Sequence, residues 1–429
     1  MALNVFERLF LMTFLLVSMQ VLIGLTRPYE AEIDPASISG TVHVFDVAIE
    51  SVVLISGALL ILQRWRRVFH AVRAVWPLVG LAAVAILSTA WSTQPTVTLR
   101  RSIMLLVATL LAVYLGERYS IEEQARFLTQ VFCLMILAIL VLRFAAPPYY
   151  VVDYVSHPGA WKGLSGYKNA FGQYMAIAVL LFLLVRFHHF QWPRYMLLVT
   201  AVGLLLLSHS AASLFCCALV AAVTPMWRSN RVIGRQRLPV YTIVAMVLVS
   251  GSYLLTTHPW LVLNLLGRNS TLTGRTQLWA TVWDAIMKHP MLGYGYEAFW
   301  TSISGDALDV RIGAGWLAQR ADNGFLDLGL SLGLLGVCLF FLVFALSFQK
   351  AIDYLRSERG PLGLWPITYL CFFLLHNMSE STLLTRGDFP DLVFIMITTS
   401  LMLNGRRRAE TAKLPYEVSS ENEFVPYAL

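Results

Sequence analysis

The 429-residue chain is 57% hydrophobic and only 13% charged. A soluble domain usually carries about 25% charged residues, so this composition excludes an ordinary soluble globular protein and predicts an integral membrane protein. The formal net charge of +7 comes mainly from arginines that flank apolar segments. It therefore signals membrane topology and does not indicate a nucleic-acid-binding surface.

Twelve apolar segments predict an all-α integral membrane protein with about 12 transmembrane helices, because a helix of roughly 20 residues crosses the bilayer core. Apolar and polar residues do not alternate along these segments, which argues against a β-barrel. The first segment is interpreted as a retained helix, since no cleavage pattern of small residues follows it. Ser208-His209-Ser210, between the seventh and eighth segments, predicts either a tight hairpin or a break in a buried helix. The segments are about 8–25, 43–63, 74–91, 102–117, 127–146, 170–186, 195–209, 211–227, 239–257, 324–347, 363–377 and 389–404.

Lysine and arginine residues predict the orientation of these helices. With both termini in the cytoplasm, 20 of the 32 lysines and arginines lie inside, as the positive-inside rule requires. Residues 258–323 then form one large periplasmic loop within a single polytopic membrane domain, residues 1–413. The polar tail, residues 414–429, is predicted to be disordered and cytoplasmic.

The long outer loop contains a predicted helix from Arg275 to Lys288. Thr273 is its predicted N-cap, and His289-Pro290 is expected to end it. We expect its apolar face to lie on the membrane surface or on the helix bundle. This face comprises Leu278, Trp279, Val282, Trp283 and Ile286.

Six basic residues near the predicted outer face form the candidate binding group. Several of them lie beside glycines, which let a backbone approach a ligand closely. Arginine binds phosphate oxygens in a bidentate manner and lysine adds a point charge, so the group suits a pyrophosphate at the bilayer surface. For each residue the alternative is a side chain that contacts only water or lipid headgroups. The six are Arg100, Arg101, Lys162, Lys168, Arg268 and Arg275.

Two acidic residues on the same face are the candidate proton acceptors. Asp322 precedes the tenth span and is followed by Asn323, whereas Glu380 lies between the last two spans. The alternatives are that Asp322 is the N-cap of the tenth helix and that Glu380 is a structural partner of an arginine. His209, flanked by serines, is interpreted as a hydrogen-bonded structural residue.

The sequence shows no His/Cys/Asp cluster with metal-ligand spacing, no Walker loop and no GxSxG motif. It therefore predicts no metal site, no cofactor and no nucleotide-driven pump. The five cysteines all lie in apolar segments and are interpreted as small buried hydrophobic residues.

Several short motifs resemble those of the O-antigen ligase and polymerase superfamily, in particular its exopolysaccharide-production, ExoQ-like branch. Each motif is short, but their order, spacing and placement on the outer face extend the resemblance over most of the chain. They are Leu87-Ser88-Thr89-Ala90-Trp91-Ser92 with Pro95 and Thr98–Ser102, Trp161-Lys162-Gly163 with Lys168-Asn169, Ser208–Ser213, Gly267-Arg268 with Leu272–Thr276 and Trp279, then Pro290, Gly293 and Gly295, Asn323–Asp327, and Glu380-Ser381.

The resemblance implies a glycosyltransferase fold of the GT-C type and a glycan donor linked to undecaprenyl pyrophosphate, without a metal or a nucleotide sugar. Three positions depart from the family pattern. The family usually has His-Asn where this chain has Asp322-Asn323, His where it has Tyr167, and Arg where it has Lys162. These departures are compatible with a polymerase or with a diverged member of the family.

The predicted activity is metal-independent, inverting glycosyl transfer that polymerises lipid-linked repeats into exopolysaccharide at the outer face of a bacterial inner membrane. Arg275 and Asp322 are the predicted catalytic residues: Arg275 stabilises the departing pyrophosphate and Asp322 accepts the proton of the attacking hydroxyl. The predicted substrate-binding residues are Arg268, Lys168, Lys162, Asn169, Arg100, Arg101, Asn323 and Glu380.

Three alternatives stay open. They are ligase-type transfer of the polysaccharide to lipid A-core or another acceptor, transport of polysaccharide, and a noncatalytic role in a synthase assembly. The expected partners are the lipid-linked glycan, membrane lipid, and the flippase and chain-length or export proteins of a polysaccharide pathway, with no nucleic acid.

Overall fold

A computed structural model describes residues 2–21, 44–154, 157–187, 190–228, 275–358 and 360–411. The predicted ninth span (239–257), Arg268, Thr273 and the predicted tail (414–429) lie outside these residues. Within the described ranges the chain is helical, and one isolated β-bridge pairs Val152 with Trp161.

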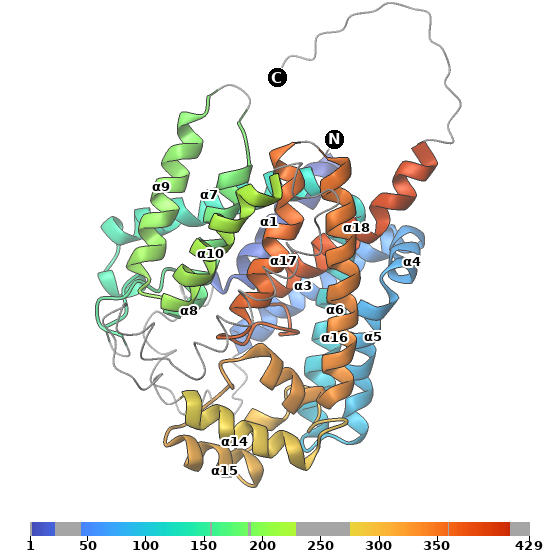
Figure 1. Cartoon of the computed structure of the whole chain (residues 1–429), viewed down its shortest axis with the longest axis vertical. Helices are drawn as coiled ribbons and strands as arrows, with labels where there is room; N and C mark the ends of the chain where they lie inside the picture. Colours follow the sequence, from blue (N-terminus) through green and yellow to red (C-terminus); the bar gives the residue numbers. More distant parts are fainter. Residues whose placement is uncertain are drawn as a thin grey trace, which may run out of the picture.

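Each of the other eleven predicted spans overlaps a helix of the bundle within the described residues (Figure 1). The helices are α1 (Ala2–Ser18), α3 (Val44–Gln63), α5 (Trp76–Leu87), α6 (Pro95–Arg118), α7 (Ile121–Ala145), α8 (Lys168–Leu184), α9 (Trp192–Leu207), α10 (Ala211–Arg228), α16 (Gly324–Ser357), α17 (Trp365–His376) and α18 (Phe389–Thr411). A further helix, α4 (Trp65–Ala74), lies between the second and third predicted spans. Short 3-10 turns occupy Ser88–Ala90, Pro148–Tyr150, Phe299–Thr301 and Pro361–Leu364. At the serine-flanked His209 the chain turns between α9 and α10, and its φ is 51°.

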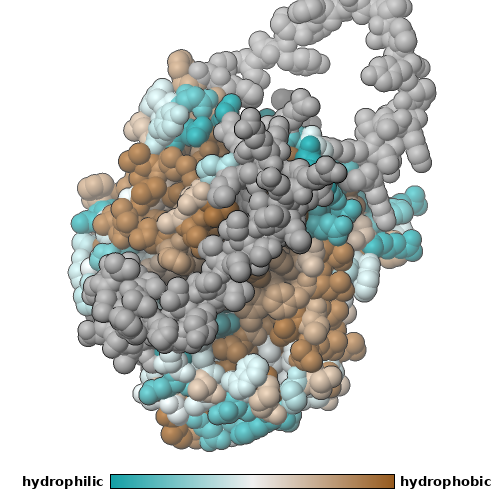
Figure 2. Space-filling view, in the orientation of Figure 1, coloured by the Kyte–Doolittle hydropathy of each residue, from teal (hydrophilic) through white to brown (hydrophobic). Residues whose placement is uncertain are grey.

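The apolar helices indicate a multi-pass membrane protein. Among the described helices, α6, α7 and α16 are each long and apolar enough to cross a membrane, and α4 with α5 form a fourth candidate bent by 94°. The apolar parts of α8, α9, α10, α17 and α18 are shorter. Figure 2 shows hydrophobic residues over the middle of the molecule and hydrophilic residues toward its two ends, as a bilayer would require.

Two further helices lie crosswise at one end of the bundle, α14 (Arg275–Lys288) and α15 (Asp306–Ala314). This end, here called the loop end, is opposite the ends at which α1 begins and α18 finishes (Figure 1). The predicted end of α14 at Lys288 is confirmed, and its first residue, Arg275, is also the first described residue of this part of the chain. Leu278 and Val282 are fully buried as expected, but Trp283 is 54% exposed. Of the predicted apolar face, α15 and α16 therefore cover the stripe of Leu278 and Val282, and they leave Trp283 uncovered.

The longest helix, α16, is interrupted at Gly333, whose φ of 61° and ψ of −159° are not helical. The loop of residues 290–297 supplies the hydrogen bonds that the interruption removes. Tyr294 N donates to Leu330 O at 2.7 Å, and Leu334 N donates to Pro290 O at 2.8 Å. A Cβ at Gly333 would lie 2.4 Å from the carbonyl carbon of Met291, so only glycine permits this backbone contact.

The other side of the 290–297 loop is held by the segment between α5 and α6. Trp91 Nε1 donates to Leu292 O at 3.0 Å, and Tyr296 N donates to Ser88 Oγ at 2.9 Å. A Cβ at Gly295 would lie 2.5 Å from the Ser92 side chain. The serine, tryptophan and glycine motifs of the sequence therefore have a structural role: they lock this loop between α6 and the break in α16.

Candidate functional site

Three segments meet at the loop end, namely the start of α14, the residues before α16, and the connection between α17 and α18. Asn323 is the N-cap of α16, because its Oδ1 accepts hydrogen bonds from Phe325 N and Leu326 N at 3.0 and 3.2 Å. Asn323 also joins the segments, since its Nδ2 donates to Met378 O at 3.1 Å and its backbone N donates to Ser381 Oγ at 3.0 Å.

Asp322 does not cap α16, so its carboxylate is available for another role. Its φ is 48°, in the left-handed region that few residues other than glycine adopt. Aspartate, asparagine and histidine are the side chains best tolerated there. Such backbone strain persists where the surrounding structure imposes it, and it is often found at functional sites.

Arg275, the first residue of α14, connects the two predicted acids. Its Nη2 lies 3.1 Å from Glu380 Oε1 and 3.3 Å from Asp322 Oδ2, and its Nη1 donates to Ser379 O at 2.9 Å. The side chains of these three charged residues are only 17%, 6% and 14% exposed, for Arg275, Glu380 and Asp322 respectively. Burial alone would lower the pKa of Arg275, but the carboxylates of Glu380 and Asp322 raise it. The guanidinium therefore stays charged.

Glu380 is also bound from the bundle side, where Asn169 Nδ2 donates to its Oε1 at 2.7 Å. Burial raises the pKa of Glu380, and the nearby Asp322 carboxylate adds to this effect while Arg275 opposes it. Glu380 is therefore a partner of an arginine, as the alternative interpretation stated. It also binds Asn169, a predicted substrate-binding residue. These residues, with Arg275, Asp322 and Asn323, are here called the Arg275 cluster.

Two residues that sequence reasoning did not select belong to the surroundings of this cluster. Burial would lower the pKa of Arg320, but the charges of Asp322 and Glu380 raise it. Burial and the same two carboxylates raise the pKa of Tyr167 to about 12. Arg320 lies two residues before Asp322 in the sequence, and this nearness to a candidate acid was the signal that could have identified it.

Asp327, which ends one of the sequence motifs but was not predicted as a site residue, fixes the segment that carries Asp322. Its carboxylate accepts hydrogen bonds from Ala321 N at 3.1 and 3.0 Å and from Trp300 Nε1 at 2.7 Å, and it also accepts one from Ser381 Oγ. The predicted motif that ends at Asp327 therefore holds the residues before α16 against both the α14–α15 layer and the α17–α18 connection.

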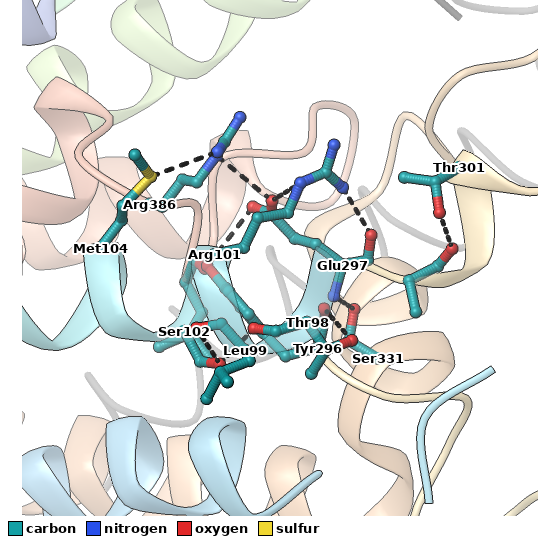
Figure 3. Close-up of polar contacts among 12 residues, drawn as sticks. Thr98, Leu99, Arg101, Ser102, Met104, Tyr296, Glu297, Thr301, Ser331 and Arg386 are labelled. Carbon is teal, nitrogen blue, oxygen red and sulfur yellow. Dashed lines mark hydrogen bonds and ion pairs between the residues drawn. The ribbon is translucent and has the colours of Figure 1, made fainter. Parts of the chain in front are cut away.

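The predicted basic group is divided by the structure. Arg101, on the second turn of α6, lies in a second cluster with Glu297 and Arg386 (Figure 3). Its Nη1 donates to Glu297 O at 2.6 Å, and its Nε lies 3.6 Å from Glu297 Oε2. Arg386 Nε lies 3.5 Å from the same oxygen. These three residues are here called the Glu297 cluster. Glu297 and Arg386 carry no motif that marks them in the sequence.

The remaining predicted lysines and arginine are placed differently. Lys168 is the first residue of α8, directly before Asn169, and its side chain is buried. Lys162 is also buried, in the turn that precedes α8. Arg100 is exposed and adjacent to Arg101. The structure thus brings Arg275, Asp322, Asn323, Glu380 and Asn169 together, and it places Arg100 and Arg101 near the other cluster.

Comparison with known proteins agrees with the motifs. Residues 164–341 match the model of a family described as O-antigen ligase. The chain is 24% identical over 377 residues to the exopolysaccharide production protein ExoQ of Rhizobium meliloti (strain 1021), with 83% of each chain covered. The predicted resemblance is confirmed. The family match contains every residue of the Arg275 cluster except Glu380.

Proposed function

We propose, from the similarity of this chain to the O-antigen ligase family and to an ExoQ protein, that it polymerises undecaprenyl-pyrophosphate-linked oligosaccharide repeats into exopolysaccharide. The family similarity supports polysaccharide polymerisation or ligation in general. The observation that carries the site is Arg275 Nη2, held 3.3 Å from Asp322 Oδ2 and 3.1 Å from Glu380 Oε1. This arrangement fixes a carboxylate at one end of a membrane bundle, where a lipid-linked substrate would present its glycan.

In the proposed reaction, a hydroxyl of the acceptor sugar attacks the anomeric carbon of the donor. The hydroxyl proton passes to Asp322, a new C–O bond forms, and the bond from the anomeric carbon to the pyrophosphate oxygen breaks with its electron pair on that oxygen. Asp322 acts as general base, a contribution of about 10²–10⁴-fold. One displacement inverts the anomeric configuration.

Arg275 has two roles in this proposal. Before the reaction it orients the Asp322 carboxylate and offsets its negative charge. When Asp322 takes up the proton, Arg275 loses one of its two negative partners, and its positive charge becomes available to the departing pyrophosphate. Stabilisation of charge as it develops in the transition state commonly contributes more to enzymatic rate acceleration than any other effect. Arg268, which lies outside the described residues, remains a predicted contributor.

The location in a bacterial inner membrane, with the loop end facing the periplasm, is part of the same proposal. It is supported by the positive-charge distribution and by the position of α14 and α15 opposite the beginning of α1 (Figure 1).

The test is the pattern of lipid-linked glycans in a strain that lacks this protein, compared with the same strain complemented by the wild-type gene. Accumulation of single repeats on the lipid would support the polymerase. Accumulation of long chains on the lipid would instead identify a ligase. An unchanged pattern would refute both glycosyl-transfer functions and leave transport or an assembly role.

A further inference from the structure

The Glu297 cluster is more loosely paired than the Arg275 cluster. Arg101 and Arg386 approach the same carboxylate oxygen, Glu297 Oε2, at 3.6 and 3.5 Å, distances of ion pairs without good hydrogen-bond geometry. Arg101 Nε is buried and has no hydrogen-bond partner among the described residues. Figure 3 shows both guanidinium groups turned toward the Glu297 carboxylate, which lies between them. One carboxylate is thus shared by two guanidinium groups.

The two clusters also differ in charge. In the Arg275 cluster and its surroundings, Arg275 and Arg320 are balanced by Asp322 and Glu380. Around Glu297, the cations are Arg101 and Arg386, with Arg100 adjacent. Asp388 is a further acid close enough to interact with Glu297, and its burial raises its pKa to about 6. Even with Asp388 ionised, three arginines (Arg100, Arg101 and Arg386) face two carboxylates (Glu297 and Asp388), so one positive charge is left without a counter-ion among the described residues.

The guanidinium groups are positioned before any ligand binds. Arg101 is fixed by its hydrogen bond to the backbone carbonyl of Glu297, and Arg386 Nη1 contacts Met104 Sδ at 3.5 Å. Glu297 itself has a φ of 50°, so the 290–297 loop holds it in a strained conformation. Two fixed guanidinium groups with one shared counter-ion match an anion that has several oxygens, because arginine forks bind phosphate oxygens in pairs.

We propose that Arg101 and Arg386 bind the pyrophosphate of a second lipid-linked substrate, and that Glu297 is the counter-ion that this pyrophosphate displaces. The inference rests on the proposed polymerase function. Both the growing chain and the incoming repeat are then attached to a lipid pyrophosphate, so a polymerase must accommodate two pyrophosphates. The Arg275 cluster serves the pyrophosphate that leaves, and the Glu297 cluster serves the pyrophosphate that stays attached to the acceptor.

The test measures binding of farnesyl diphosphate to the purified full-length protein in detergent by microscale thermophoresis. We expect Arg101→Gln and Arg386→Gln each to weaken binding about tenfold. Glu297→Gln should strengthen binding severalfold, because it removes the competing carboxylate. Lys288→Gln is the matched control, since it removes one exposed cation of the same end, paired with Asp306, and should leave binding unchanged.

Unchanged affinity in both arginine variants, or weaker binding in Glu297→Gln, would show that the three residues form only a structural ion cluster. Thermal unfolding of each variant identifies loss of fold, and Glu297→Gln keeps the test decisive if the arginine variants do not fold. Phosphatidylglycerol that competes as well as farnesyl diphosphate would identify a lipid-headgroup site and overturn the assignment.

Failure of this diphosphate site can be distinguished from failure of the proposed polymerase function. Wild-type protein that transfers glycan, with unchanged diphosphate affinity in Arg101→Gln and Arg386→Gln, would remove this site and leave the polymerase function in place. Wild-type protein that binds the diphosphate through Arg101 but transfers no glycan would leave the site in place and remove the polymerase function.

Discussion

Replacement of Asp322 by asparagine separates its proposed chemistry from its backbone role. Asn tolerates the left-handed conformation that Asp322 adopts at φ 48°, so this change should leave the backbone in place. Arg275 keeps its contacts to Glu380 Oε1 and Ser379 O at 3.1 and 2.9 Å. We therefore expect a loss of only about 1 kcal/mol in stability, less than the roughly 3–5 kcal/mol for a buried charge left without any partner.

The activity of Asp322→Asn should fall far more than its stability. Removal of a general base costs about 10²–10⁴-fold in rate. Asp322→Ala should lose the same activity and about 1–2 kcal/mol more stability, because alanine bears the full strain of the left-handed backbone. Asp322→His, which restores the residue usual in the family, should retain measurable activity, since histidine both tolerates this backbone and accepts a proton.

The assay is glycan transfer from a purified lipid-linked donor, with thermal unfolding of each variant measured in the same detergent. Turnover of Asp322→Asn within about threefold of wild type would refute the base assignment. In that case Arg275 would be left as an electrostatic clamp on the leaving group, without a dedicated proton acceptor.

Four further outcomes are expected from the same contacts. Arg275→Lys should lose activity nearly as fully as Arg275→Ala, because one ammonium group cannot span two carboxylates and a carbonyl; wild-type transfer at equal protein levels would contradict this. Gly295→Ala should lower thermal stability clearly more than Gly305→Ala, since both glycines have positive φ but only the first has a side chain within 2.5 Å of the added Cβ. Asp388→Asn should exceed wild type in melting temperature at pH 7.5, because burial raises the pKa of Asp388 to about 6 and its ionised form is disfavoured in the folded state; the gap should close as the pH falls to about 4, and a constant gap would exclude this cause. A cysteine at exposed Ser304 should react with an impermeant maleimide in intact spheroplasts, and labelling only after lysis would reverse the proposed orientation.

The helices were predictable because each carries its signal locally. The end of α14 at Lys288 follows from a helical apolar stripe that stops before a His-Pro pair. The break in α16 could not be predicted, since Gly333 lies in an apolar run that predicts one continuous helix. The break depends on hydrogen bonds from the 290–297 loop, and a contact between distant segments leaves no local pattern.

Residues of the candidate site could be selected from the sequence, but their division into two clusters could not. Arg275, Asp322 and Glu380 could be selected because polar side chains beside membrane spans are few. The sequence offered no reason to place Arg101 apart from Arg275. Arg101 lies in a separate cluster because the 290–297 loop brings Glu297 next to α6. Glu297 follows a run of aromatic and glycine residues, and no neighbouring charged residues mark it in the sequence.

Of the acids that face arginines at the loop end, Asp322 and Glu297 share a left-handed backbone but experience opposite electrostatic surroundings. Around Asp322 the charges of two arginines and two carboxylates cancel. A pyrophosphate therefore gains little electrostatic energy there until the Asp322 carboxylate takes up a proton. Around Glu297 positive charge is in excess, so a pyrophosphate gains electrostatic energy as soon as it displaces the side chain. In the proposed mechanism, the first arrangement would couple anion binding to proton transfer, as the leaving group of a transferase requires. The second would bind an anion without chemistry, as an acceptor that must stay attached to its lipid requires.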